Sequence, residues 1–184
     1  MCVGSTTAPW STYPPASVIS DNATKLTARD LGDPLVLIAT GAGCGLFPVA
    51  PGTVGSLLGA VIWWFAFAEL DLPIRALAAC AAFALATLAV QRLQTRKAVG
   101  DSPAIVVDEI VGIWFALLAA PKSPSWVIAG FLLFRLLDIA KPWPISWADR
   151  NLKGGLGTML DDLMAGVATT GVLALAGWVL VDIV

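Results

Sequence analysis

The sequence predicts an all-α membrane protein, a polytopic helical bundle with about five spans. Hydrophobic residues make up 58% of the 184 residues and charged residues only 13%, whereas soluble domains carry about 25% charge. Apolar stretches close to the roughly 17–25 residues that cross a bilayer recur along the chain. The 8 tryptophans against 1 tyrosine fit the same class. A soluble helical domain with a large core is the alternative.

Two segments come before the predicted spans: an N-terminal extension and an apolar segment broken by glycines and prolines. Residues 1–34 are rich in Ser, Thr, Pro and Asp and lack the apolar centre of a signal peptide, so we expect a flexible N-terminal extension. We expect residues 35–184 to form a membrane-embedded domain that contains all of the apolar stretches. Its first part is apolar, but it holds Gly41, Gly43 and Gly45 and then two prolines, which disfavour a straight helix. We therefore predict a re-entrant or broken helical segment near residues 35–53.

Five apolar stretches follow, and basic residues orient them. Arginines and lysines gather before the first stretch, after the second and after the fourth, and such residues stay in the cytoplasm. This bias places the N-terminus inside. The predicted spans are Val54–Leu70, Ile74–Val90, Ala104–Ala120, Trp126–Ala140 and Leu163–Val181.

Five acidic residues lie at the ends of these stretches that face the cytoplasm in this topology. Carboxylates are costly beside hydrocarbon, and neighbouring carboxylates repel each other unless a cation neutralises them. Mg²⁺ is a hard cation that prefers oxygen ligands, so the pattern predicts a divalent-cation site. The alternative is that the acids stabilise helix dipoles from the first turn. The five are Asp108, Glu109, Asp138, Asp161 and Asp162.

Basic and capping residues near these acids predict a phosphate site. Arg135 and Lys141 flank Asp138 and are suited to clamp phosphate oxygens, although Arg135 and Asp138 also have the spacing of a local ion pair. The stretch Pro51–Ser56 opens a helix, with Thr53 expected as its N-cap. Free amides at a helix start bind phosphate, but simple capping with close helix packing explains this stretch equally well.

Several functions are disfavoured by composition. The chain has no histidine, which excludes histidine phosphatases, Ser-His-Asp hydrolases and His-ligated zinc enzymes. The net charge of −2 and the lack of a dense basic stripe argue against nucleic acid as a partner. A divalent-cation transporter remains the alternative, although transport favours acids near the middle of the membrane. Trp143 and Trp147 suit an interfacial aromatic belt.

Four motifs carry a family resemblance: GAGCGLFPVAPGTVGS from residue 41, VVDEIVG from 106, FRLLDIAKPWP from 134 and DRNLKGGLGTMLDDLMAG from 149. In this order they resemble the phosphatidylglycerophosphatase A family, over about Leu35 to the C-terminus. The resemblance implies a Mg²⁺-dependent lipid phosphatase of phospholipid biosynthesis, hydrolysing phosphatidylglycerophosphate to phosphatidylglycerol. It further implies a multi-pass protein of the bacterial inner membrane with its active site facing the cytoplasm. The oligomeric state stays open.

The roles expected on this basis are hypotheses. The metal ligands are the five acids. Asp161, Asp162, Arg135 and Lys141 are the catalytic residues, with Asp162 as the general base. The substrate-binding residues are Thr53, Ser56, Arg135, Lys141 and Arg150.

Overall fold

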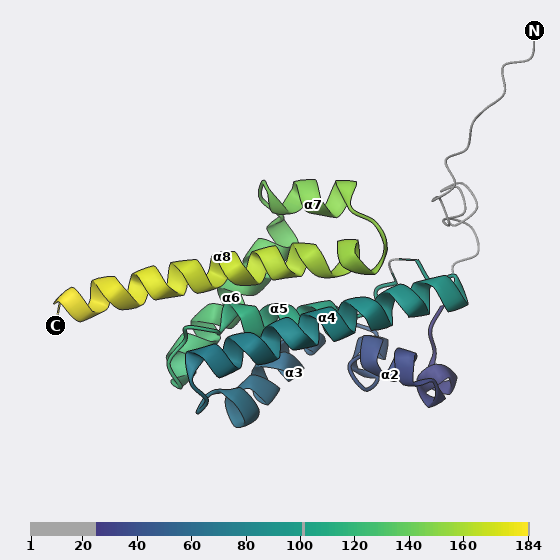
Figure 1. Cartoon of the computed structure of the whole chain (residues 1–184), viewed down its shortest axis with the longest axis horizontal. Coiled ribbons are helices and arrows are strands. Elements are labelled where there is room, and N and C mark those ends of the chain that lie inside the picture. Colours follow the sequence, from purple (N-terminus) through teal and green to yellow (C-terminus); the bar gives the residue numbers. More distant parts are fainter. Residues whose placement is uncertain (1–24, 101, 184) are drawn as a thin grey trace, which may run out of the picture.

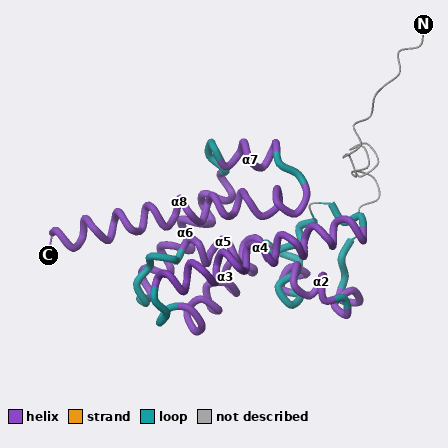
Figure 2. Tube along the Cα trace, viewed as in Figure 1, coloured by secondary structure: helices purple, strands orange, loops and turns teal. Residues whose placement is uncertain are grey.

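The computed structural model describes residues 25–100 and 102–183, and all secondary structure in these residues is helical (Figure 2). The all-α class is therefore confirmed. Residues 1–24 of the predicted flexible extension lie outside the described residues. A 3₁₀ turn, η1 (Ala28–Gly32), falls within residues 25–34. There the Asp30 side chain accepts a hydrogen bond from the Thr27 amide and forms an ion pair of 2.7 Å with Lys97.

The apolar segment near residues 35–53 is broken, as its glycines predict. Helix α2 (Pro34–Ala39) ends in a turn where Gly41, Ala42 and Gly43 all have positive φ. A single 3₁₀ turn, η2 (Cys44–Leu46), follows, and α3 (Pro51–Ile62) begins after it. The residue before α3 is Ala50, in the left-handed conformation. The prediction that Thr53 caps α3 is therefore wrong, because Thr53 already lies in its first turn.

The prediction of about five spans is also wrong. Within residues 25–100 and 102–183, two helices are long and apolar enough to cross a membrane, α4 (Leu72–Lys97) and α8 (Gly154–Ile183). Helix α5 (Val107–Ala116) has 10 residues, which extend about 15 Å, half of a bilayer core of about 30 Å. The apolar window 104–120 had combined this helix with the turns at both its ends. The two remaining predicted spans correspond to α3, followed by a π-helical turn, η3 (Trp63–Phe67), and to α6 (Pro124–Ala140).

Helix α5 forms the centre of the molecule and contacts α3, α4, α6 and α8 (Figure 1). Its crossing with α8 is close because both helices have a glycine there. A Cβ on Gly166 would overlap the carbonyl oxygen of Gly112, and a Cβ on Gly112 would lie 2.7 Å from the Phe134 ring and 3.1 Å from Cβ of Asp162. The crossing therefore brings the acidic first turn of α5 beside the acids of α8.

The start of α8 is held from two sides. The short helix α7 (Ile145–Asn151) packs against α8. On the other side, Gln91 of α4 accepts a hydrogen bond of 2.7 Å from the Gly155 amide, and Gln94 donates one of 3.1 Å to Thr158. These contacts fix the first turns of α8, where the two acidic residues lie.

Candidate metal and phosphate site

A pocket of about 420 Å³ opens where the starts of α3, α5 and α8 meet the end of α6 and one side of α7. Its lining gathers charged side chains from segments far apart in sequence. Four acids and two bases face it together, a composition suited to a cation and an anion bound side by side. These residues are Asp108, Glu109, Arg135, Lys141, Asp149 and Asp161.

Three carboxylates form the closest cluster in the part of the chain that the structure describes. One oxygen from each of Asp108, Glu109 and Asp162 lies within 4.8 Å of the other two. Asp108 is 8% exposed and Asp162 only 3%. Asp162 also interacts electrostatically with Asp138 and Asp161. The structure thus brings all five predicted acids into one group, and three of them are close enough to share one ion.

The electrostatics of this cluster favour a bound cation. Burial raises the pKa of Asp108 well above its usual value, and the charge of Glu109 raises it further. Burial also raises the pKa of Glu109. Among the described buried atoms, Oε2 of Glu109 and Oδ1 of Asp161 have no hydrogen-bond partner. Buried carboxylate oxygens are normally satisfied, so an oxygen-seeking cation fits this set of donors.

The two basic side chains of the pocket are held by neighbouring carboxylates. Nη1 of Arg135 lies 2.7 Å from Oδ2 of Asp138 and 3.3 Å from the Ser56 hydroxyl. Nζ of Lys141 lies 2.5 Å from Asp149 and 2.6 Å from Oδ2 of Asp161. Burial works against the charge of Lys141, but the two carboxylates outweigh it and raise the pKa of Lys141 above its usual range. Both side chains therefore present fixed positive charge beside the acidic cluster.

Gly52, in the first turn of α3, determines where one ligand lies. A Cβ at this position would overlap Oε1 of Glu109, and it would sit 3.1 Å from Cδ of Glu109 and 3.4 Å from Nη1 of Arg135. Only glycine lets the Glu109 carboxylate rest against the start of α3. The buried Ser56 lies one turn later and donates to the Gly52 carbonyl at 2.9 Å.

Gly52 and Asp149 also belong to the site, although neither is among the predicted site residues. Gly52 belongs to a motif whose other glycines pack helices, and nothing in its spacing distinguishes a glycine that touches a carboxylate. Asp149 lies eight residues after Lys141, across a turn with two prolines, and helical periodicity does not join them. Five predicted residues do not line the pocket. Ser56 and Asp138 contact Arg135, and Asp162 belongs to the carboxylate cluster. Thr53, half-buried in α3, and Arg150, exposed on α7, have no such link to the site. Their roles stay predictions.

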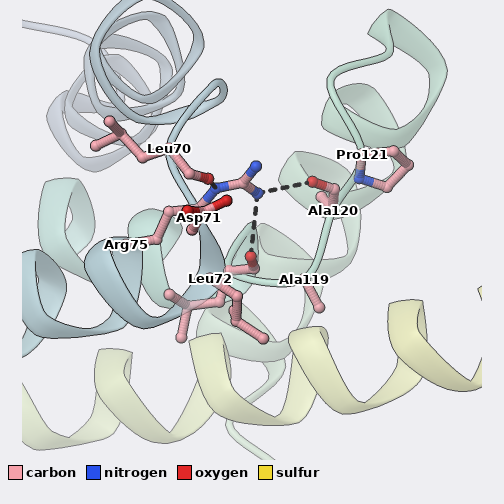
Figure 3. A pocket seen from close by; sticks show the side chains of 8 residues that line it. Leu70, Asp71, Leu72, Arg75, Ala119, Ala120 and Pro121 are labelled. Atoms are coloured by element: carbon pink, nitrogen blue, oxygen red, sulfur yellow. Dashed lines mark hydrogen bonds between the residues drawn. The ribbon is translucent and has the colours of Figure 1, made fainter.

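A second cavity of about 370 Å³ lies between the turn after η3, the start of α4 and the loop after α5. Figure 3 shows the Arg75 guanidinium between the backbone of Leu70 and that of Ala120. It also donates to the carbonyls of Ala68 and Leu118, at 2.7 and 3.2 Å. Arg75 thus caps the ends of two helices, and with its donors engaged it does not offer a phosphate clamp.

Comparison with known proteins gives consistent matches. Residues 37–177 match the model of the family described as phosphatidylglycerophosphatase A. The chain is 40% identical to the phosphatidylglycerophosphatase A of Escherichia coli, over 80% of this chain and 86% of that protein. It is 38% identical to the Haemophilus influenzae protein of the same name, over 80% and 92%. It is 41% identical to a putative phosphatidylinositol-3-phosphatase of Bacteroides thetaiotaomicron, over 79% and 94%. No solved structure matches.

Proposed function

The chain belongs to the phosphatidylglycerophosphatase A family, and we propose that this phosphatase removes the terminal phosphate of phosphatidylglycerophosphate to give phosphatidylglycerol. The observation that carries this proposal is the pocket itself, in which a carboxylate cluster lies beside Arg135 and Lys141. A phosphate monoester needs charge neutralisation on both sides of the reacting phosphorus. The alternative of a divalent-cation transporter is not favoured by these relatives.

Mg²⁺ is the ion we propose for the carboxylate cluster. Asp108, Glu109 and Asp162 would hold it, and Asp138 would position Arg135 beside them. Bound there, Mg²⁺ would neutralise phosphate charge and provide a water of lowered pKa. The unpartnered oxygen of Glu109 and the close approach permitted by Gly52 support this assignment.

The chain's own side chains would then orient the phosphate. Arg135 has a buried Nε without a hydrogen-bond partner among the described residues, and Lys141 keeps its charge at the pocket wall. Both would bind phosphate oxygens, and the amides at the start of α3 would add helix-dipole stabilisation. These contacts would hold the phosphate beside the carboxylate cluster.

Asp161 is better suited than Asp162 to act as the general base. Lys141 holds Oδ2 of Asp161, and Asp161 lines the pocket, whereas Asp162 does not line it and is only 3% exposed. Asp161 would take a proton from the attacking water as the bond between phosphorus and the glycerol oxygen breaks. The proton that the leaving oxygen needs would come from solvent at the open pocket. Asp162 belongs instead to the ligand cluster.

We further propose that residues 35–184 act as one domain in the bacterial cytoplasmic membrane, with the pocket facing the cytoplasm. The basic residues Arg92, Arg96 and Lys97 lie at the end of α4, and Lys153 lies just before α8. The loop after α4 and the first turns of α8 line the pocket, and basic residues stay on the cytoplasmic side. The substrate phosphate would then meet the site from the inner leaflet.

The test is phosphate release by the full chain in lipid nanodiscs, with Mg²⁺ or with a chelator. We expect Mg²⁺-dependent release from phosphatidylglycerophosphate, and a loss of about 100-fold or more in Asp162→Asn together with weaker metal binding. Asp71→Asn, an equal change beside the second cavity, serves as the control. Phosphatidylinositol 3-phosphate and phosphatidic acid test the headgroup. Equal release with the chelator would reject the metal assignment, and faster hydrolysis of phosphatidylinositol 3-phosphate would reject the substrate.

A further inference from the structure

One face of α7 bears aromatic and basic side chains that the proposed chemistry does not use. Trp143, just before the helix, is 81% exposed, and Trp147 is 54% exposed. Arg150 is exposed and lies three residues after Trp147, so their side chains share one face of the helix. Ile145 and Ala148 lie on the opposite face and are buried. Trp143, Trp147 and Arg150 together are called the α7 outer face below.

The position of α7 along α8 predicts at which depth of a membrane the α7 outer face would lie. Helix α7 packs beside the first turns of α8 and runs in the opposite direction (Figures 1 and 2). The loop that precedes α7 therefore points the way in which α8 continues. Beyond those turns α8 exposes large apolar side chains, from Val167 to Val179. The tryptophans thus lie between the charged end of the molecule and its apolar section.

The chemistry of the face matches the surface of an anionic bilayer. Tryptophan combines a large apolar ring with one polar N–H, and it concentrates at the boundary between headgroups and acyl chains. An arginine beside it is attracted to lipid phosphates. Lys153, exposed two residues after the end of α7, adds a second positive charge to this part of the chain.

The face is connected to the pocket through one chain of ion pairs. Asp149, on α7, lines the pocket and binds Lys141, which also binds Asp161 at 2.6 Å. Anything that fixes α7 therefore fixes one wall of the pocket and the lysine within it. We infer that the α7 outer face binds the surface of an anionic phospholipid bilayer and holds the pocket at the level of the lipid phosphates. The inference rests on the proposed function for its substrate, but the placement of α7 does not.

Placement is tested by spin labels in a chain whose own cysteines are replaced by serine, in nanodiscs that contain anionic lipid. A label introduced by Trp147→Cys should be relaxed more by oxygen, which concentrates in the bilayer, than by a water-soluble nickel chelate. A label introduced by Lys153→Cys, at the other end of α7, should show the opposite preference. Equal relaxation by the nickel chelate at both positions would overturn the inference.

The effect of membrane binding by the α7 outer face on catalysis is tested by comparing two substrates. The double change Trp143→Ala and Trp147→Ala should raise KM roughly ten-fold for long-chain phosphatidylglycerophosphate in a bilayer, but it should leave kcat/KM unchanged for a water-soluble short-chain analogue. The matched double change to Phe should restore most of the loss, and Trp178→Ala, near the far end of α8, should have no effect. Equal losses on both substrates would indicate a structural role and refute the inference. If the parent chain hydrolyses neither substrate, the proposed function fails, while the spin labels still decide the placement.

Discussion

Replacing Gly52 by Ala should weaken metal binding without weakening the fold. The added Cβ would overlap Oε1 of Glu109, whereas it would only touch Nη1 of Arg135, 3.4 Å away. Both are the far ends of flexible side chains, so the backbone can stay in place while the carboxylate moves. The displaced group, however, is one of the three proposed ligands of the cation.

The substitution should affect fold stability and Mg²⁺ affinity in opposite directions. Alanine is favoured over glycine inside a helix by up to about 1 kcal/mol, so the free energy of unfolding should stay level or rise slightly. Disturbing the support of a metal ligand typically lowers metal affinity about 10–100-fold, which is about 1.4–2.8 kcal/mol. The Mg²⁺ concentration for half-maximal phosphate release should therefore rise by that factor.

The assay is a Mg²⁺ titration of phosphate release, run beside thermal unfolding of the same samples. Gly171→Ala is the matched control, because a Cβ added there would meet no described atom within 4 Å beyond its chain neighbours and the adjoining backbone of its own helix. It should share the small gain in stability and leave the Mg²⁺ requirement unchanged. If both variants titrate like the parent chain, Glu109 is not held against Gly52 as a ligand, and the reasoning fails.

Two further predictions concern stability. Arg75→Met should lower the free energy of unfolding by about 2–4 kcal/mol, because the carbonyls that Arg75 binds lose their donor. Lys122→Met breaks only an exposed ion pair with Glu69 and should lower the free energy of unfolding far less. Similar losses of the two variants in thermal unfolding would contradict this difference. The ion pair with Lys97 and the bonds from Thr27 lower the pKa of Asp30 to about 2, below the unfolded value of about 3.9, so its stabilisation is present above pH 4 and is lost as the pH falls toward 2. The melting temperatures of the parent and Asp30→Asn should therefore converge over that range, and a constant gap would rule this linkage out.

The sequence predicted the residues of the site better than it predicted the arrangement of the helices. The acids and the bases near them stood out because charge is rare in this chain, and the structure brings all five acids together with Arg135 and Lys141. Hydropathy failed on the number of spans. An apolar window counts a buried 10-residue helix such as α5 and its flanking turns as one segment, since burial in protein and burial in lipid select the same side chains.

The sequence by itself determined the all-α class, the break after α2, and which rare charges would matter, because composition, glycine and proline act locally. Tertiary structure alone decided which of those charged residues lie together. The crossing of α5 and α8 at Gly112 and Gly166 places Asp162 with Asp108 and Glu109, while Asp161, its neighbour in sequence, turns to Lys141 and the pocket. Adjacent residues on a helix point about 100° apart, and only the packing of neighbouring helices determines what each one meets.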